Sequence, residues 1–253
     1  MDTHSPLWIV LRNYYQCDGF GAAWQSGPGM QNVTKEARAT GMTGLPTGEI
    51  DLVYGALQCL ILRLKHLDFA RYTSEFKLLD LVLDHVDDWK GGYASYYHID
   101  LPFAKKVYTR LHTGGSPLPD EAAGSDVGYD KLPCIMELQH LIKRAHRFVA
   151  VSDEIYARIL ALPSVQNKDR PQLSAFAIYT QHLQAECLKV IAPMAEERGL
   201  RVMAHVFDSV YVVAQSDNKL HEACADISRT LQSTYGVKVA LKGANGAKLL
   251  PPP

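Results

Sequence analysis

Apolar residues recur three or four positions apart in several stretches of the chain, which is the spacing of one buried helix face. The clearest example is residues 54–67, where Leu57, Leu60, Ile61 and Leu64 follow this spacing. The same pattern predicts further helices along the chain. These segments are 74–89, 103–111, 172–197 and 217–234, with one or two helices in 132–162.

Short runs of β-branched and aromatic residues predict strands between these helices. They occupy residues 50–53, 200–213 and 236–242. Asp208 and Ser209 interrupt the second run, so we expect a hairpin with a tight turn at Phe207, Asp208 and Ser209. The chain is therefore predicted to be α/β (α+β), with helices flanking an antiparallel sheet.

Segments rich in glycine, serine, threonine and proline separate these elements. Residues 17–48 and 114–131 are of this kind and are predicted to form loops. Residues 247–253 are expected to be a disordered tail. A length of 253 residues permits one large domain or two small ones, and we expect a single domain over residues 1–253.

The composition is that of an ordinary globular protein, 47% hydrophobic and 21% charged. A net charge of −1 excludes nucleic-acid binding through bulk positive charge, but not through a local basic face. The five cysteines are never in CxxC spacing, which favours reduced thiols in an intracellular protein over a disulfide scaffold or a zinc cluster. No segment has the pattern of a secretion signal or a membrane span, so we expect no membrane partner.

Two aspartates stand at unusual places in the predicted sheet. Asp51 lies in an apolar strand just before a helix, and Asp208 lies at the tip of the predicted hairpin. Neighbouring carboxylates repel each other unless a cation lies between them, so the pair predicts Mg²⁺ or Mn²⁺. Local structure offers another explanation, with Asp208 as a turn residue and Asp51 as a helix-entry residue.

Five segments resemble, in order and separation, motifs of the family A DNA polymerases, especially the shortened relatives of viruses and mobile elements. They are "GMQNVTKEAR" (29–38), "EIDLVYGALQCLIL" (49–62), "AKKVYTRLHTGG" (104–115), "YTQHLQAECLK" (179–189) and "HVFDSVYVVA" (205–214). The second and fifth are similar to the metal-binding motifs A and C, and the third to the fingers helix of motif B. The resemblance implies a right-hand polymerase palm with a helical fingers insertion at about residues 68–165.

The resemblance also implies a function, a template-directed DNA polymerase that adds dNTPs to a primer 3′-hydroxyl with two Mg²⁺ ions, or Mn²⁺. In this reading the catalytic and metal-binding residues are Asp51 and Asp208. The residues expected to bind the incoming nucleotide are Lys105, Lys106 and Arg110. The residues expected to contact the primer–template DNA are Gln31, Asn32, Gln181 and Lys189.

A basic run in residues 132–162 is a further candidate for binding DNA phosphates. It consists of Lys143, Arg144 and Arg147. Such a run is equally explained as the solvated face of a helix. If these residues contact duplex DNA, each neutralised phosphate steepens the salt dependence of binding.

Several positions depart from the family pattern. Phe207 and Ser209 stand where motif C has His and Glu, and Ala56 stands where motif A has an acid, although Glu49 is a possible substitute. These losses favour an alternative, a catalytically degenerate palm that acts as a nucleic-acid-binding or assembly module. A phosphohydrolase is a third hypothesis. A partner chain is a possible source of a thumb domain.

Overall fold

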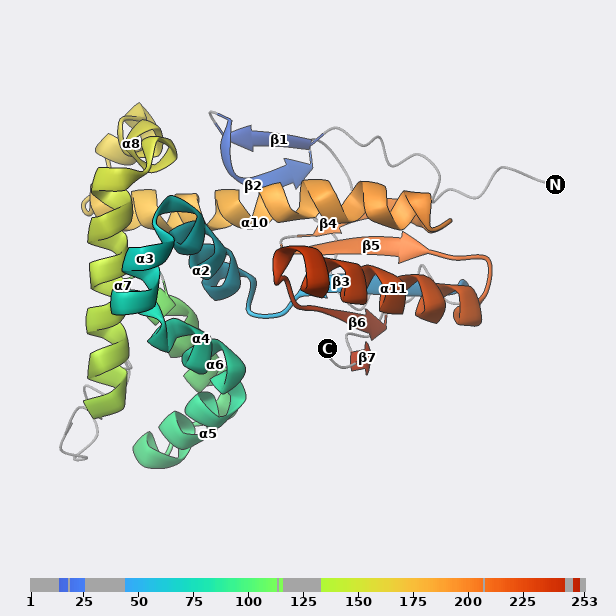
Figure 1. The fold of residues 1–253 in the computed structure, drawn as a ribbon, viewed down its shortest axis with the longest axis horizontal. Helices are drawn as coiled ribbons and strands as arrows, with labels where there is room; N and C mark the ends of the chain where they lie inside the picture. Colours follow the sequence, from blue (N-terminus) through green and yellow to red (C-terminus); the bar gives the residue numbers. More distant parts are fainter. Residues whose placement is uncertain are drawn as a thin grey trace. The chain divides into compact units, whose positions relative to one another are not determined.

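The computed structural model describes residues 14–17, 19–25, 44–112, 114–115, 133–206, 208–243 and 248–250. The chain divides into two compact units (Figure 1), one of residues 1–59 with 181–253 and the other of residues 60–180. The insertion expected at about 68–165 falls within the second unit, and the single domain expected over 1–253 stays a prediction.

A five-stranded antiparallel sheet forms the centre of the first unit. Its strands lie in the order β4 (Arg201–Val206), β5 (Ser209–Val213), β3 (Thr47–Leu52), β6 (Val239–Gly243) and β7 (Lys248–Leu250). β3 therefore has a hydrogen-bonded neighbour on both sides, and β4 and β5 form the hairpin predicted from the sequence. The structure confirms a mixed α/β chain with an antiparallel sheet.

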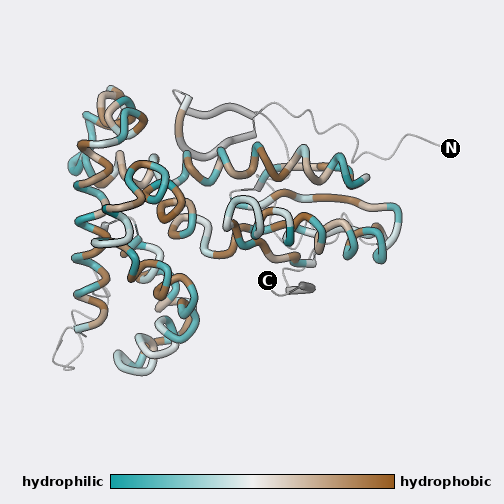
Figure 2. The backbone as a smooth tube through the Cα atoms, viewed as in Figure 1, coloured by the Kyte–Doolittle hydropathy of each residue, from teal (hydrophilic) through white to brown (hydrophobic). Residues whose placement is uncertain are grey.

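The two faces of β3 carry different chemistry because side chains alternate along a strand. Ile50 and Leu52 are buried on the face covered by α11 (Asp217–Tyr235). Figure 2 shows that hydrophobic residues occur along the strands of this sheet. Gly48 belongs to this face, where a Cβ would stand 2.6 Å from Cδ1 of Leu241 and 3.4 Å from Cδ2 of Leu220 on α11. Glu49 and Asp51 point to the opposite face.

The second unit is helical in its described residues. Besides parts of α2 (Gly55–Leu67) and α10 (Pro171–Glu197), it contains α3 (Phe69–Arg71), η3 (Tyr72–Phe76), α4 (Leu78–Asp84), α5 (Val86–Tyr97), α6 (Leu101–His112), α7 (Pro133–Ser152), α8 (Glu154–Leu160) and α9 (Pro163–Gln166). A buried carboxylate, Asp153, joins three of these helices. It accepts hydrogen bonds from Arg63 on α2 at 2.7 and 3.0 Å, from the Tyr179 hydroxyl on α10 at 2.6 Å, and from the first turn of α8.

Two sequence-based expectations differ from the structure. The helix expected over 74–89 is divided at His85, where α4 ends and α5 begins. Asp87 and Asp88 in the first turn of α5 favour a helix N-terminus there, because acidic side chains stabilise that end of the helix dipole. In the expected tail, residues 248–250 instead form β7, which pairs with β6.

A further strand pair lies near the beginning of the chain. β1 (Tyr14–Cys17) and β2 (Phe20–Gln25) are antiparallel, and β2 lies within the segment 17–48 that the sequence predicted to form loops. The Phe20 ring contacts the ring of His182 on α10 edge to face, with 5.3 Å between the ring centroids. This contact joins the strand pair to α10 within the first unit.

Candidate active site

Asp51 lies on β3, and Asp208 lies in the turn that precedes the neighbouring strand β5. Asp51 is the penultimate residue of β3 and is paired in register with Ser209, the residue that follows Asp208. The backbone carbonyl of Asp208 accepts a hydrogen bond from the Leu52 N–H at 3.0 Å. The backbone thus fixes the hairpin turn beside the end of β3.

The two carboxylates interact electrostatically. Burial raises the pKa of Asp51 to about 6, and the charge of Asp208 acts in the same direction. Glu49, two residues before Asp51 on the same face of β3, adds to this effect. The site therefore concentrates negative charge in a place where water screens it poorly, and such a place favours a cation.

Lys242 already supplies one positive charge. It lies on β6 opposite Glu49 in register, and its Nζ is 2.5 Å from Oδ2 of Asp51. The Lys242 and Asp51 side chains are 27% and 13% exposed, so this ion pair is largely shielded from water. The hydrogen bond and the charge of Lys242 lower the pKa of Asp51, but less than burial and the acidic neighbours raise it.

Ser209 occupies the place where the resemblance leads one to expect an acid. Its side chain is fully buried, and its hydroxyl donates a hydrogen bond to Oε1 of Glu49 at 2.6 Å. Glu49 was named from the sequence as a possible substitute for that acid. The hydrogen bond from Ser209 holds the Glu49 carboxylate on the same face as Asp51.

The start of α2 is fixed beside this site by one buried amide. The Gln58 side chain donates to the carbonyl of Lys238 at 3.0 Å and accepts from the N–H of Lys238 at 2.9 Å. The Val53 N–H also donates to the Lys238 carbonyl, at 3.0 Å. These bonds hold the segment that follows Asp51 against the segment that precedes β6.

A divalent ion fits the donors at this site. Mg²⁺ is commonly held by one or two carboxylates, with water and substrate phosphates as its other ligands, and Asp51 with Asp208 offers two carboxylates. Within the described parts of the chain, no group of three or more His, Cys, Asp or Glu side chains is arranged to hold a metal ion.

Two of the residues expected to contact DNA belong to the same unit as Asp51 and Asp208. Gln181 and Lys189 are exposed on α10, and Lys189 forms an ion pair with Glu186 at 2.5 Å. Gln31 and Asn32 lie outside the described residues, as does Phe207 of the hairpin turn.

The basic residues that were expected to bind the incoming nucleotide or the DNA phosphates belong to the second unit. On α6, Lys105 and Lys106 are exposed and Arg110 is half-buried; on α7, Lys143, Arg144 and Arg147 are exposed. Arg144 donates to the carbonyl of Glu75 at 3.1 Å, which gives it a structural contact. A common site that includes these residues and Asp51 stays a prediction.

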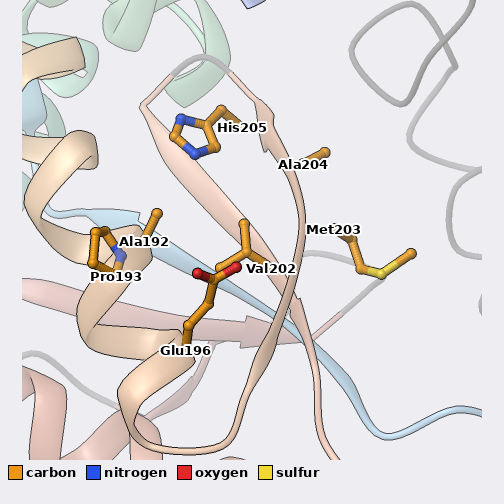
Figure 3. Close-up of a pocket in the computed structure, with 7 residues that line it drawn as sticks. All are labelled: Ala192, Pro193, Glu196, Val202, Met203, Ala204 and His205. Atoms are coloured by element: carbon orange, nitrogen blue, oxygen red, sulfur yellow. The ribbon is translucent and has the colours of Figure 1, made fainter. Parts of the chain in front are cut away.

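One pocket of the first unit was not anticipated from the sequence. It has a volume of about 270 Å³ and lies between α10 and β4 (Figure 3). Its lining is mostly apolar, with Glu196 and His205 as the ionisable side chains. None of its lining residues belongs to the acidic pair.

The chain matches no protein-family model and no curated protein sequence. The resemblance to family A polymerases therefore rests on the sequence motifs alone. Among the helices of the described residues, none has the length and apolar character needed to span a membrane.

Proposed function

We propose that this chain is a template-directed DNA polymerase in which the sheet of the first unit is the palm. The observation that carries the proposal is the pairing of Asp51 with the hairpin turn that contains Asp208. One carboxylate is on β3 and the other is in the turn before the adjacent antiparallel strand β5. A 3.0 Å hydrogen bond joins the backbone of Leu52 to that of Asp208, and the charge of Asp208 raises the pKa of Asp51. Phosphoryl transfer needs little covalent chemistry from a protein, so such a site acts by positioning and by neutralising charge.

Asp51 and Asp208 would hold the divalent ions, Mg²⁺ or Mn²⁺. When bound, these ions would supply positive charge to the primer 3′-hydroxyl and to the triphosphate of the dNTP. Ser209 keeps the Glu49 carboxylate in place, and Lys242 neutralises Asp51 when no metal is bound. In this proposal Lys105, Lys106 and Arg110 bind the triphosphate, and Gln181 and Lys189 contact the primer–template.

Primer extension by the purified full-length chain tests this function. A labelled primer annealed to a DNA template, with dNTPs and Mg²⁺ or Mn²⁺, should be extended by the wild type. Asp51→Asn and Asp208→Asn should each lower the extension rate by about 10³-fold or more, because each removes charge from the ion site. Asp217→Asn, an exposed aspartate at the start of α11, is the matched control and should retain the wild-type rate. Wild-type extension by either Asp51→Asn or Asp208→Asn would refute the assigned roles.

A degenerate palm that binds nucleic acid without catalysis is a second candidate. Two observations favour it, namely the Lys242–Asp51 ion pair and the replacement of an expected acid by the buried Ser209. This candidate predicts binding to a primer–template duplex with no extension under Mg²⁺ or Mn²⁺. Extension that disappears in Asp51→Asn would exclude it.

A further inference from the structure

Two cysteines from distant parts of the sequence meet inside the first unit. Cys59 lies on α2 and Cys187 on α10, and their Sγ atoms are 3.4 Å apart. A disulfide bond is about 2.05 Å long, so a small movement of either side chain brings the sulfurs to bonding distance. Of the other cysteines with described side chains, Cys134 is exposed and Cys224 is buried.

The backbone around this pair is held on both helices. Gln58, beside Cys59, is fixed by its two hydrogen bonds to Lys238. α2 and α10 approach closely near this pair. A Cβ added to Gly55 on α2 would lie only 2.6 Å from Nε2 of Gln184 on α10. The two thiols therefore face each other as a consequence of helix packing.

The two thiols are not equivalent. Cys59 is only 3% exposed, whereas Cys187 is half-buried and can meet a small oxidant. A hydrogen bond between the sulfurs lowers the pKa of Cys187, although burial opposes this. The same hydrogen bond raises the pKa of Cys59, as do burial and the charge of Asp208. These opposite shifts make Cys187 the sulfur with more thiolate character.

We propose that Cys59 and Cys187 are a site of reversible oxidation that forms an intramolecular disulfide between α2 and α10. With a peroxide as the oxidant, the Cys187 thiolate attacks one peroxide oxygen, becomes a sulfenic acid and releases water after proton uptake. The Cys59 sulfur then attacks the Cys187 sulfur, the S–O bond breaks, and a second water leaves. Two thiols and one hydrogen peroxide thus give one disulfide and two waters.

The bond would lie close to the acidic pair. α2 follows directly after β3, which carries Asp51, and the charge of Asp208 acts on Cys59. Oxidation would affect nucleotidyl transfer only if the proposed function is correct, so that effect rests on the proposed function. The oxidation itself does not, and it is tested without any activity measurement.

The test uses the native full-length chain treated with about one equivalent of hydrogen peroxide. Free thiols are then blocked under denaturing conditions, and the protein is analysed by intact mass and by peptide mapping. We expect the loss of two thiols, a peptide pair that joins Cys59 to Cys187, and full recovery of both thiols with dithiothreitol. Absence of that peptide pair, with Cys187 free or carrying a single added oxygen, would overturn the proposal.

Variants provide the controls. Cys187→Ser should form no cross-link at Cys59, whereas Cys224→Ser should oxidise as the wild type does. The oxidised wild type should melt on the order of 5 °C higher than the reduced protein, because a cross-link over this sequence separation restricts the unfolded chain. Oxidised Cys187→Ser should show no such rise; an equal rise in that variant would contradict the assignment. If Cys187→Ser fails to fold, the peptide map of the wild type decides the question.

Discussion

Lys242 and Asp51 form an ion pair across the β3–β6 ladder, with the lysine Nζ 2.5 Å from the carboxylate Oδ2. The acid that we propose as a metal ligand is therefore neutralised by the chain itself. Burial and, to a lesser extent, the charge of Asp208 nevertheless raise the pKa of this carboxylate, so the opposing effect of Lys242 does not offset them. Lys242 and an added divalent ion thus compete for the same carboxylate, and this competition determines how the site should respond to metal, to pH and to mutation.

Replacing Lys242 with methionine should strengthen divalent-metal binding. The lysine competes for Oδ2 of Asp51, and methionine has a similar length without the charge. We expect the dissociation constant for Mn²⁺ at pH 8 to fall by about 3- to 10-fold, the range for losing one partly shielded charge interaction. Titration followed by the electron paramagnetic resonance signal of free Mn²⁺ measures this.

Lys219→Met, on the exposed surface of α11, is the matched control for this experiment and should leave Mn²⁺ binding unchanged. Asp51→Asn should weaken it strongly in either background. An unaltered dissociation constant in Lys242→Met would mean that the ion does not use the carboxylate that Lys242 contacts.

The metal-free protein should lose stability as pH rises through the pKa of Asp51. Burial and the charge of Asp208 raise this pKa to about 6 in the folded protein, compared with about 4 in the unfolded chain. The folded state therefore holds the proton more tightly, and this contribution is complete below about pH 4 and lost as pH rises through about 6. As pH rises from 4 to 7.5, the free energy of unfolding of Asp51→Asn should therefore increase by about 1–3 kcal/mol relative to that of the wild type.

Urea unfolding of both proteins in the presence of a chelator, at several pH values, gives this difference. Asp217→Asn should track the wild type, because its carboxylate is exposed. A constant difference between Asp51→Asn and the wild type over the whole pH range would show that Asp51 does not titrate near 6.

The basic face of α7 should contribute to the salt dependence of duplex binding. Lys143 and Arg147 are exposed, whereas Arg144 is partly engaged by the carbonyl of Glu75. Removing two phosphate contacts with Lys143→Gln and Arg147→Gln should lower the log–log salt slope by about 1.8, from about 0.9 per contact. Fluorescence anisotropy of a labelled duplex over a range of KCl concentrations measures the slope. Lys168→Gln, also exposed in the second unit, should leave it unchanged, and an unchanged slope in the double variant would remove α7 from the interface.

The local parts of the site could be predicted from the sequence. A strand followed at once by a helix, and a hairpin interrupted by Asp208, are patterns within a few residues, and the structure has both. Strand alternation then places Asp51 and Glu49 on one face. The division of the expected 74–89 helix at His85 does not follow from apolar spacing; its local signal is the pair of acids Asp87 and Asp88, which favours a second helix start.

The partners of these residues could not be predicted in the same way. The register of β3 and β6 pairs Lys242 with Glu49, which brings the lysine near Asp51, two residues further along the same face of β3. No local pattern sets the register of two strands so far apart in sequence. The hydrogen bond from Ser209 to Glu49 and the contact of Cys59 with Cys187 also depend on long-range packing. A buried serine in an apolar strand was the available sequence signal for the first of these.

The position of β3 at the centre of its sheet has a consequence for biosynthesis. Both of its neighbouring strands, β5 and β6, come from residues 209–243, after the whole of the second unit in the chain. During translation, β3 therefore leaves the ribosome without either strand partner, while residues 60–180 form a continuous segment whose helices can pack first. The Asp51 carboxylate can meet Asp208 once the hairpin has been synthesised, but it can meet Lys242 only after β6 has been, so the ion pair of the acidic site cannot form before residue 242 leaves the ribosome.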